Sequence, residues 1–365
     1  MLYSTVIVRS ERNIENHERT ADQRRVQDCP SPPDFAMTHV IPSSADVNGS
    51  DVDVSIIMAV YNSERFIADA LNACLAQTGV KFEIIVSDDG SDQSMIPLVE
   101  RICKGDPRVV TLRSPQNSGP AHARNQALRI AKGEFIAIVD SDDLVAPSRI
   151  SRLVETARDT GADIVVDNLI EFSETPRGRQ EKMFLSGSKA QFERAIDLTE
   201  YMRSGLKNDS RHSYGYLKPL IRRKSIEMGG FSYRQSVRIS EDYYLLADML
   251  RAGCRMLYIP QRGYYYRRHT GSLTHRAEAE HIRLIVDAEE AFRSQLEPAL
   301  SEEQIRWSKR RSKVFRKMYQ FERMAHFVKN HRYLDAFCTF IKRPPDMPSQ
   351  VSRGLWLLVR KAMRP

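Results

Sequence analysis

Several features that would assign this sequence of 365 residues to a protein class at once are missing. Its five cysteines are dispersed, with no CxxC pair and no His/Cys spacing typical of zinc sites, which argues against a disulfide framework and for a reducing compartment. No apolar run is long enough to span a bilayer, and the N-terminal segment lacks the basic start and the long apolar core of a signal peptide. We therefore expect a cytoplasmic protein.

Glycine-rich phosphate-binding loops are missing as well. Neither GxxxxGK[ST] nor GxGxxG follows the first predicted strand, Val54–Val60, where the chain continues as Tyr61–Glu64. A P-loop NTPase and a dinucleotide-dependent oxidoreductase therefore lose their main support. Internal repeats are absent, and a content of 41% hydrophobic and 28% charged residues is that of an ordinary folded chain with one large or two smaller domains.

Positive charge is concentrated towards the C-terminal end. The net charge is +8, but residues 306–365 contain 16 Lys and Arg against three acidic residues, which leaves −5 for the rest of the chain. This asymmetry favours contact between the C-terminal region and an anionic partner such as membrane headgroups, a polyanionic ligand or nucleic acid.

Strand-like and helix-like segments alternate in the first half of the chain. Apolar runs predict strands at Val54–Val60, Phe82–Ser87, Val109–Arg113, Phe135–Val139 and Asp163–Leu169. Helical spacing of apolar residues predicts helices at Phe66–Leu75, Ser94–Lys104, Gly119–Ala131 and Pro147–Thr160, the first capped by Ser63. This alternation predicts an α/β fold with a doubly wound, mostly parallel, Rossmann-like sheet and helices on both faces.

The second half of the chain is less regular. Residues 170–211 are polar without a clear period, which predicts loops or short helices. Ser240 is a predicted N-cap, with Glu241 and Asp242 in the first turn of the following helix. These acids either complement the helix dipole alone or direct one carboxylate towards a binding site. From Arg276 onward we expect a predominantly helical, basic chain.

An acidic cluster ends the fourth predicted strand. Asp140, Asp142 and Asp143 follow its apolar run directly, and isolated carboxylates are too costly to bury. They form either a hard oxygen site suited to Mg²⁺ or Mn²⁺ or an acidic cap for the next helix. Polar residues also end the first two strands, at Tyr61–Asn62 and Asp88–Asp89. Because ligands of parallel sheets bind beyond such strand ends, this coincidence favours a binding site.

Five short motifs in this order resemble those of the family 2 glycosyltransferases, which have a GT-A fold and use nucleotide-diphospho-sugars. The motifs are Val54–Ile57 with Val60–Asn62, Ser87–Ser91, Asn117–Ala121 with Ala123–Asn125, Asp140–Asp143, and Glu241–Asp242. The resemblance extends from Val54 to Thr274.

Within that family, Tyr214–Ile221 and Tyr266–Thr274 resemble bacterial exopolysaccharide enzymes of the succinoglycan type. Two positions depart from the usual pattern. Many members have proline where Ala59 stands, and many have Thr-Asp where this chain has Asp92–Gln93. Neither departure removes an acid that the chemistry needs.

The resemblance implies a role for individual residues. The nucleotide-binding residues are Val60 and Tyr61 beside the base, Glu64 in the same loop, Asp88 on the uracil edge, Arg124 near the phosphates and Asp140 at the ribose. Asp142 is the implied ligand of Mg²⁺ or Mn²⁺. His269 either joins it near the diphosphate or is a structural histidine. Asp242 is the implied general base.

The resemblance also implies an organisation into regions. Residues 1–50 are a disordered or weakly ordered extension. Residues 51–275 are the GT-A domain, in which 51–170 bind the nucleotide-sugar and 171–275 bind the acceptor. Residues 276–365 are a helical, basic C-terminal region.

The implied activity is inverting transfer of a sugar from a UDP-sugar to a hydroxyl group of a glycan, such as a lipid-linked oligosaccharide in exopolysaccharide or surface polysaccharide synthesis. One alternative is a nucleotidyltransferase, which would need a glycine-rich basic loop after the first strand. Another is a non-catalytic basic scaffold or a nucleic-acid-binding protein, but the C-terminal cations are not interleaved with a stacking platform. We therefore expect no nucleic-acid partner.

A short apolar segment near the C-terminus allows two interpretations. Leu355–Val359 contains Trp356 and lies between Arg353 and Arg360–Lys361. It suits either an interfacial segment on the cytoplasmic face of the inner membrane or a basic helix that packs on the catalytic domain.

Overall fold

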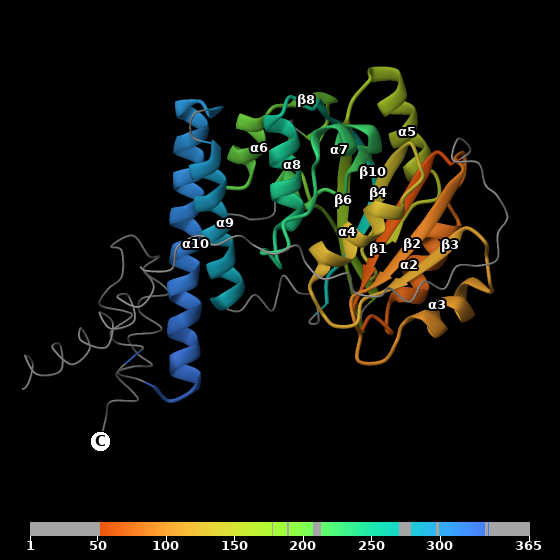
Figure 1. Ribbon diagram of the computed structural model, residues 1–365, viewed down its shortest axis with the longest axis horizontal. Coiled ribbons are helices and arrows are strands. Elements are labelled where there is room, and N and C mark those ends of the chain that lie inside the picture. The colour runs from red at the N-terminus through yellow and green to blue at the C-terminus, as the bar shows by residue number, and fades with distance from the viewer. Residues whose placement is uncertain are drawn as a thin grey trace, which may run out of the picture. The chain divides into compact units, whose positions relative to one another are not determined.

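A ten-stranded sheet organises the part of the chain that the structure describes (Figure 1). The computed structural model describes residues 52–176, 178–187, 190–206, 213–269, 279–296, 299–332 and 335. The order of the strands is β3-β2-β1-β4-β9-β6-β10-β5, with β7 paired to β6 and β8 paired to β10. The predictions for residues 1–50 and for Leu355–Val359 lie outside the described residues.

Strands β3, β2, β1 and β4 form the parallel part of the sheet. Their bounds are Val109–Arg113, Phe82–Asp88, Val54–Val60 and Phe135–Ile138, close to the predicted ones. β1 lies between β2 and β4 and is buried along almost its whole length, as its unbroken apolar sequence predicts. Val60 pairs with Asp88, so the polar segments after both strands begin at the same edge of the sheet.

The rest of the sheet is mixed. Its strands are β9 (Leu220–Arg222), β6 (Ile164–Thr175), β10 (Met256–Arg267), β5 (Leu144–Val145), β7 (Gly178–Met183) and β8 (Arg194–Ile196). β9 is antiparallel to both β4 and β6, whereas β10 is parallel to β6. The expected parallel arrangement therefore describes the first four strands and the long pair β6 and β10, and the short strand β9 joins these two parts through antiparallel pairing.

Four predicted helices connect the strands of the first half and are confirmed. They are α2 (Ile67–Leu75), α3 (Ile96–Cys103), α4 (Pro120–Ile130) and α5 (Arg149–Thr160). Their buried residues recur at helical spacing, for example Ile150, Leu153, Val154 and Ala157 in α5.

Gly133 allows the chain after α4 to turn directly onto β1. A β-carbon at this position would lie 2.4 Å from the backbone nitrogen of Ser55. The hydroxyl of Ser55 accepts the backbone N–H groups of Lys132 and Gly133 and donates to Glu83. This close approach places the start of β4 beside β1.

Two local predictions are wrong, and a third is confirmed only in part. Ser63 does not cap α2, because the helix begins at Ile67 without a side-chain cap, and the Ser63 hydroxyl lies 2.9 Å from that of Ser141. Ser240 is the N-cap residue of α8 (Glu241–Arg251), with Glu241 and Asp242 in the first turn as predicted, but its side chain makes no capping hydrogen bond. Residues 170–211 are more regular than expected, since β6 continues to Thr175 and pairs with β7 as an antiparallel hairpin.

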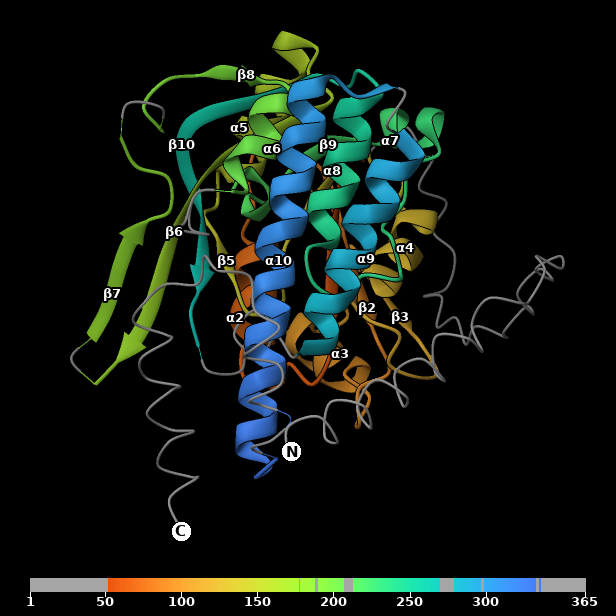
Figure 2. The ribbon, with the colours of Figure 1, turned by 90° about the vertical axis from the view of Figure 1, so that its left-hand side faces the viewer.

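Two long helices follow β10, in agreement with the expected helical C-terminal region. α9 (Ala279–Leu296) and α10 (Glu302–Lys329) lie side by side and pack near α6 (Leu198–Ser204) and α8 (Figures 1 and 2). Ile285 and Phe292 of α9 are buried there. Among the helices that the structure describes, none combines the length and the apolar character needed to cross a bilayer.

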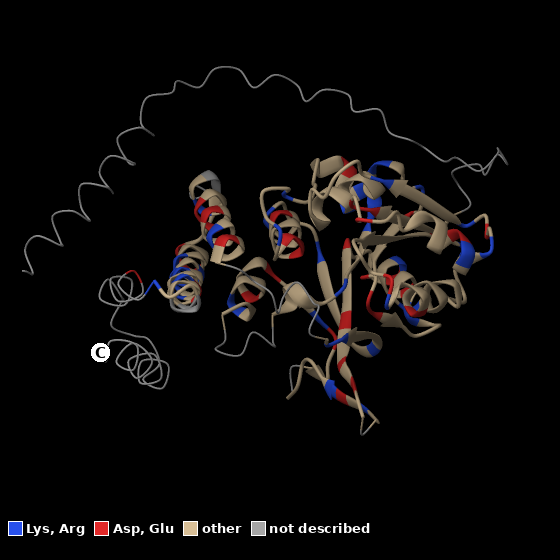
Figure 3. Cartoon of the chain, turned by 90° about the horizontal axis from the view of Figure 1, so that it is seen from below, with Lys and Arg blue, Asp and Glu red and all other residues tan. Residues whose placement is uncertain are grey.

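Acidic residues of α9 offset part of the positive charge of α10. α10 contains nine Lys and Arg against three Glu, whereas α9 contains four acidic residues against two Arg. Arg316 pairs with Glu290, and Arg311 pairs with Glu289. Both signs of charge are visible on this helix pair in Figure 3.

Candidate active site

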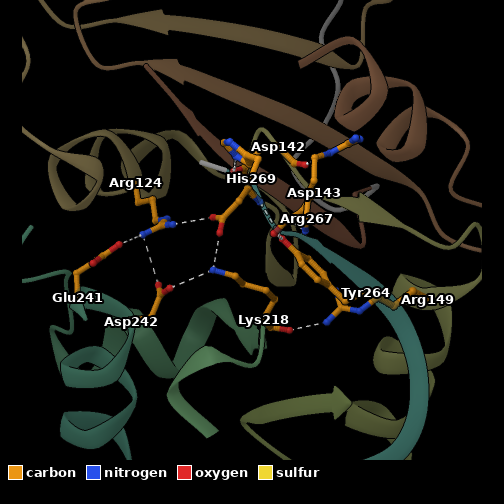
Figure 4. Close-up of polar contacts among 11 residues, drawn as sticks. Arg124, Asp142, Asp143, Arg149, Lys218, Glu241, Asp242, Tyr264, Arg267 and His269 are labelled. Carbon is orange, nitrogen blue, oxygen red and sulfur yellow. Dashed lines mark hydrogen bonds and ion pairs between the residues drawn. The ribbon is translucent and has the colours of Figure 1, made fainter. Parts of the chain in front are cut away.

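Side chains from four separate elements meet beyond the end of β4 (Figure 4). Asp140, Asp142 and Asp143 follow β4, and Arg124 projects from α4. Lys218 precedes β9, and Glu241 and Asp242 begin α8. The structure therefore brings together acids and cations that are distant in the sequence, such as Arg124 and Glu241, which are 117 residues apart.

Asp140 holds two cations at once. Its Oδ1 lies 2.8 Å from Nη2 of Arg124, and its Oδ2 lies 2.6 Å from Nζ of Lys218. Burial acts to raise the pKa of Asp140, but the charges of Lys218 and Arg124 outweigh it and bring the pKa down to about 2. Asp140 is therefore ionised at neutral pH.

Asp242 faces the same two cations at a longer distance. Its Oδ1 lies 3.5 Å from Nη1 of Arg124, and its Oδ2 lies 3.5 Å from Nζ of Lys218. Asp140, Arg124, Asp242 and Lys218 thus form a closed ring of alternating charges (Figure 4). Oδ1 of Asp242 is buried and makes no hydrogen bond within the described part of the chain, which leaves it able to accept a proton from a substrate.

Glu241 anchors the start of α8 to Arg124. Its carboxylate bonds Nη1 of the guanidinium. Burial raises the pKa of Glu241, against the opposing charge of Arg124. Burial acts to lower the pKa of Arg124, but Asp242, Asp140 and Glu241 raise it well above its usual range. The guanidinium is therefore permanently charged and already surrounded by carboxylates.

The other two acids after β4 have different environments. Asp143 is fully buried, and its oxygens accept the Tyr264 hydroxyl and the Arg267 backbone N–H, each at 2.7 Å. Asp142 is more accessible, and its Oδ2 lies 2.8 Å from Nε2 of His269. Burial, reinforced by the charge of Asp140, raises the pKa of Asp142. Asp143 therefore supports the loop, whereas Asp142 faces outwards with His269.

Arg267 and Tyr264 hold this loop from β10. Arg267 is buried, and its Nε donates to the carbonyl oxygen of Asp142 at 2.8 Å. The Tyr264 hydroxyl also accepts the Asp140 backbone N–H at 3.1 Å. Arg149 packs against the Tyr264 ring and pairs with buried Asp167. The acidic loop is therefore fixed by β10, in which Tyr264 and Arg267 make the contacts.

A divalent cation fits Asp142 and His269. Ligand oxygens of the three acids after β4 lie within 4.8 Å of one another. Those of Asp140 and Asp143 are already engaged, which leaves one carboxylate and one imidazole adjacent and partly exposed. A hard cation with few protein ligands completes its coordination with water and phosphate oxygens, as Mg²⁺ and Mn²⁺ do.

Asp88, the predicted contact of the uracil edge, is the last residue of β2. This side chain is buried, and its carboxylate accepts the backbone N–H groups of Ser91 and Met95, each at 3.0 Å, and the Arg113 guanidinium at 2.8 Å. Asp88 therefore holds the loop after β2 together, and its contact with a uracil edge stays a prediction. Its neighbour Asp89 likewise accepts backbone N–H groups, from Ser118 and Gly119.

The remaining nucleotide-site candidates differ in accessibility. Tyr61 is 43% exposed after the end of β1, whereas the Val60 side chain is buried in the core. Glu64 is exposed on the loop that follows. Tyr61 is thus the best placed of the three to contact a base, and these roles stay predictions.

Lys218, Tyr264 and Arg267 were not found from the sequence as site residues. Lys218 and Arg267 lie in segments that resemble the succinoglycan-type enzymes, and Tyr264 lies in a tyrosine-rich segment. No regular sequence spacing relates any of them to the acids. Lys218 lies two residues before β9, and its burial becomes apparent only when β9 is placed beside β4.

Comparison with known proteins identifies the family. The family model described as glycosyl transferase family 2 matches residues 55–227. The succinoglycan biosynthesis protein ExoO of Rhizobium meliloti (strain 1021) is 39% identical over 242 residues, which cover 66% of this chain and 68% of ExoO. This chain belongs to glycosyl transferase family 2. The resemblance derived from the motifs is confirmed, and the chain is a glycosyltransferase.

One further relative and one solved structure are also similar to this chain. The Escherichia coli protein WfaP, named as a UDP-Glc:α-D-GlcNAc-diphosphoundecaprenol β-1,3-glucosyltransferase, is 30% identical over 239 residues, 63% of this chain and 83% of WfaP. The crystal structure of S. aureus TarS 1–349 in complex with UDP-GlcNAc matches with a TM-score of 0.55 at 19% identity, covering 85% of this chain and 88% of TarS 1–349. This match confirms the GT-A fold.

Proposed function

We propose that this protein is a metal-dependent, inverting glycosyltransferase that moves a sugar from a UDP-sugar to a hydroxyl group of a glycan acceptor during polysaccharide synthesis. The observation that carries the proposal is the ring of ion pairs that joins Asp140, on the loop of the metal-ligand candidate Asp142, to Asp242 at the start of α8. The ring supports the proposal because its ion pairs hold the acidic loop close to a second carboxylate, that of Asp242. The names of ExoO and WfaP and the UDP-GlcNAc bound to TarS support the polysaccharide, the lipid-linked acceptor and the donor class.

Asp242 acts as the general base. A sugar hydroxyl is a poor nucleophile until its proton is removed, and a carboxylate within hydrogen-bond reach accepts that proton as the new bond forms. The buried Oδ1 without a hydrogen-bond partner is the atom suited to this task. As the acceptor oxygen bonds to the anomeric carbon, the bond from that carbon to the UDP oxygen breaks. Attack from the face opposite the leaving group converts an α-linked donor into a β-linked product.

Asp142 and His269 would hold the divalent cation. When bound, the cation supplies positive charge that stabilises the negative charge of the leaving UDP. Arg267 fixes the backbone of Asp142, and Ser63 reaches the same loop through Ser141. Tyr61 lies near the base, and Asp140 approaches the ribose with the part of its side chain that remains accessible.

The protein acts in the cytoplasm, peripherally at the inner membrane, because a lipid-linked acceptor would be presented at that surface. The charge of the C-terminal region supports this placement.

A donor panel with matched variants tests the proposed activity. The full chain is incubated with Mn²⁺ or Mg²⁺ and each of UDP-glucose, UDP-galactose and UDP-N-acetylglucosamine, and is scored by thermal shift and by slow release of UDP. Asp142→Ala should lose the metal-dependent stabilisation. Asp242→Asn should keep it but lose about 100-fold or more in turnover, since general-base catalysis contributes 10²–10⁴-fold.

Asp159→Asn on the exposed face of α5 is the control and should behave as the unmodified protein. Absence of a response to every nucleotide-sugar would contradict the proposed activity. Strongly weakened donor binding in Asp242→Asn would contradict the role of Asp242 while leaving the enzyme class intact.

A further inference from the structure

We propose that the C-terminal helices α9 and α10 are needed for the transferase activity. In this proposal Arg311 of α10 positions α8, the helix that carries Asp242. This inference rests on the proposed role of Asp242 as the base. It concerns a region beyond the segment that the family model matches, which ends at residue 227. α10 packs near α6 and α8 in both views of the fold (Figures 1 and 2).

Arg311 joins α10 to α8 through a stacking contact. Its guanidinium carbon lies 3.6 Å from the centroid of the Tyr243 ring, and both side chains are buried. A planar guanidinium on an aromatic face is a favourable and directional contact when water is excluded. Tyr243 is the residue directly after Asp242, so the contact acts one residue away from the base.

Glu289 of α9 fixes the orientation of Arg311. Its Oε2 lies 3.0 Å from Nε of Arg311, and its Oε1 accepts the Ser308 hydroxyl at 2.9 Å. The Tyr244 hydroxyl of α8 also donates to Oε2, at 3.1 Å. Glu289 has no exposed surface. A buried carboxylate with three donors therefore connects α9, α10 and α8 in one network, and such networks specify a single arrangement.

The neighbouring elements are shaped to admit Arg311. A β-carbon at Gly205, after α6, would lie 2.9 Å from Nη1 of Arg311. On α6, the Tyr201 ring stacks on Tyr243 at 5.1 Å, and its hydroxyl donates to the Tyr243 carbonyl oxygen at 3.2 Å. Tyr243 is thus held by α6 and α10 together.

The backbone just before α8 is strained and needs packing contacts to hold its conformation. Ser240 has a φ of 71°, a left-handed conformation that is unfavourable for a residue with a β-carbon. Strained residues persist only where the surrounding structure over-determines them. Ser240 lies two residues before Asp242, so the packing of Tyr243 and Tyr244 on α9 and α10 maintains the direction in which Asp242 points.

Hydrogen exchange and turnover of Arg311→Met test the inference in the full-length protein. We expect amide exchange in residues 241–251 to accelerate at least tenfold. Release of UDP from the UDP-sugar that the unmodified protein turns over fastest should fall about 10- to 100-fold, since small displacements of a catalytic group cost that much. The dissociation constant for UDP with Mn²⁺ should stay within twofold, which separates loss of positioning from general unfolding.

Lys309→Met, on the exposed side of the same helix, is the control and should change neither quantity. If Arg311→Met does not fold, the double variant Glu289→Gln/Arg311→Met removes both buried charges and takes its place. Exchange within twofold of the unmodified protein, or unchanged turnover in a folded variant, would overturn the inference. If the unmodified protein turns over no UDP-sugar, the proposed function fails, and the exchange of α8 alone decides the role of Arg311.

Discussion

At the scale of single residues, the site contains two buried cations that are paired with two carboxylates. Arg124 and Lys218 are both buried, and each contacts Asp140 and Asp242. Asp140 makes the short contacts and Asp242 the long ones. The tight pairs therefore fix the positions of the cations, and the loosely held carboxylate keeps an oxygen for chemistry.

Replacing Lys218 tests this balance. Lys218→Met leaves Asp140 and Asp242 with Arg124 as their remaining cation, and an uncompensated buried charge costs about 3–5 kcal/mol. We expect the free energy of unfolding in urea to fall by about that amount, together with a loss of turnover.

The matched control is Lys224→Met on the exposed surface of α7 (Arg223–Gly229), which should change stability by less than about 0.5 kcal/mol. A loss in Lys218→Met no larger than that of the control would show that the ring contributes nothing to stability.

At the scale of elements, the position of β4 follows from one close backbone approach. The acidic loop lies where it does because β4 pairs with β1 immediately after the turn at Gly133. The other end of the loop is held by Arg267 and Tyr264 of β10. The geometry of the acids is thus set by two strands and does not depend on the loop alone.

Adding a methyl group at Gly133 tests the first of these constraints. The β-carbon of Gly133→Ala would meet the backbone of Ser55, and overpacking against backbone costs about 1–3 kcal/mol. We expect a corresponding drop in the free energy of unfolding and a weaker thermal shift with UDP and Mn²⁺.

Gly105→Ala separates this steric effect from backbone strain. Gly105 has a φ of 71°, and its β-carbon would meet nothing within 4 Å, so this variant reports only the cost of the left-handed conformation, about 1 kcal/mol. Gly133→Ala should preserve ordinary backbone dihedrals yet bind UDP more weakly, whereas Gly105→Ala should bind UDP normally. Equal UDP binding by both variants would contradict the link between the turn and the site.

At the scale of the whole molecule, charge is divided between two regions. Residues 306–365 carry a large excess of Lys and Arg, while the remainder is acidic overall. The acids of α9 offset part of this excess within the described residues. The proposed membrane contact can be tested on the cations that follow α10 in the sequence.

Vesicle sedimentation tests that contact. The full chain should sediment with vesicles that contain anionic phospholipid, less so at high salt because exposed charges are screened, and not with neutral phosphatidylcholine vesicles. A chain truncated at Met347, which lacks Leu355–Val359 and the last cations, should lose most of the binding. Unchanged binding after truncation would remove the membrane hypothesis.

The sequence by itself determined the parallel strands, their connecting helices and the family. Continuous apolar runs and helical spacing are local properties, so β1, β2, β3 and α4 are found within a few residues of their predicted bounds. The family could be inferred from the motifs because each is a short local segment that can be read directly from the sequence. The acids after β4 were recognisable as a candidate site because isolated carboxylates directly after a buried strand are too costly to bury without a cation or hydrogen-bond donors.

Only the tertiary structure decided which partners those acids have. The ring of Asp140, Arg124, Asp242 and Lys218 joins residues from α4, α8 and the segment before β9, and no local period relates them. The same holds for Asp88, whose three donors fold back onto it from its own loop and from β3. Long-range contacts depend on how elements pack, and packing is a property of the assembled sheet and helices rather than of any one segment.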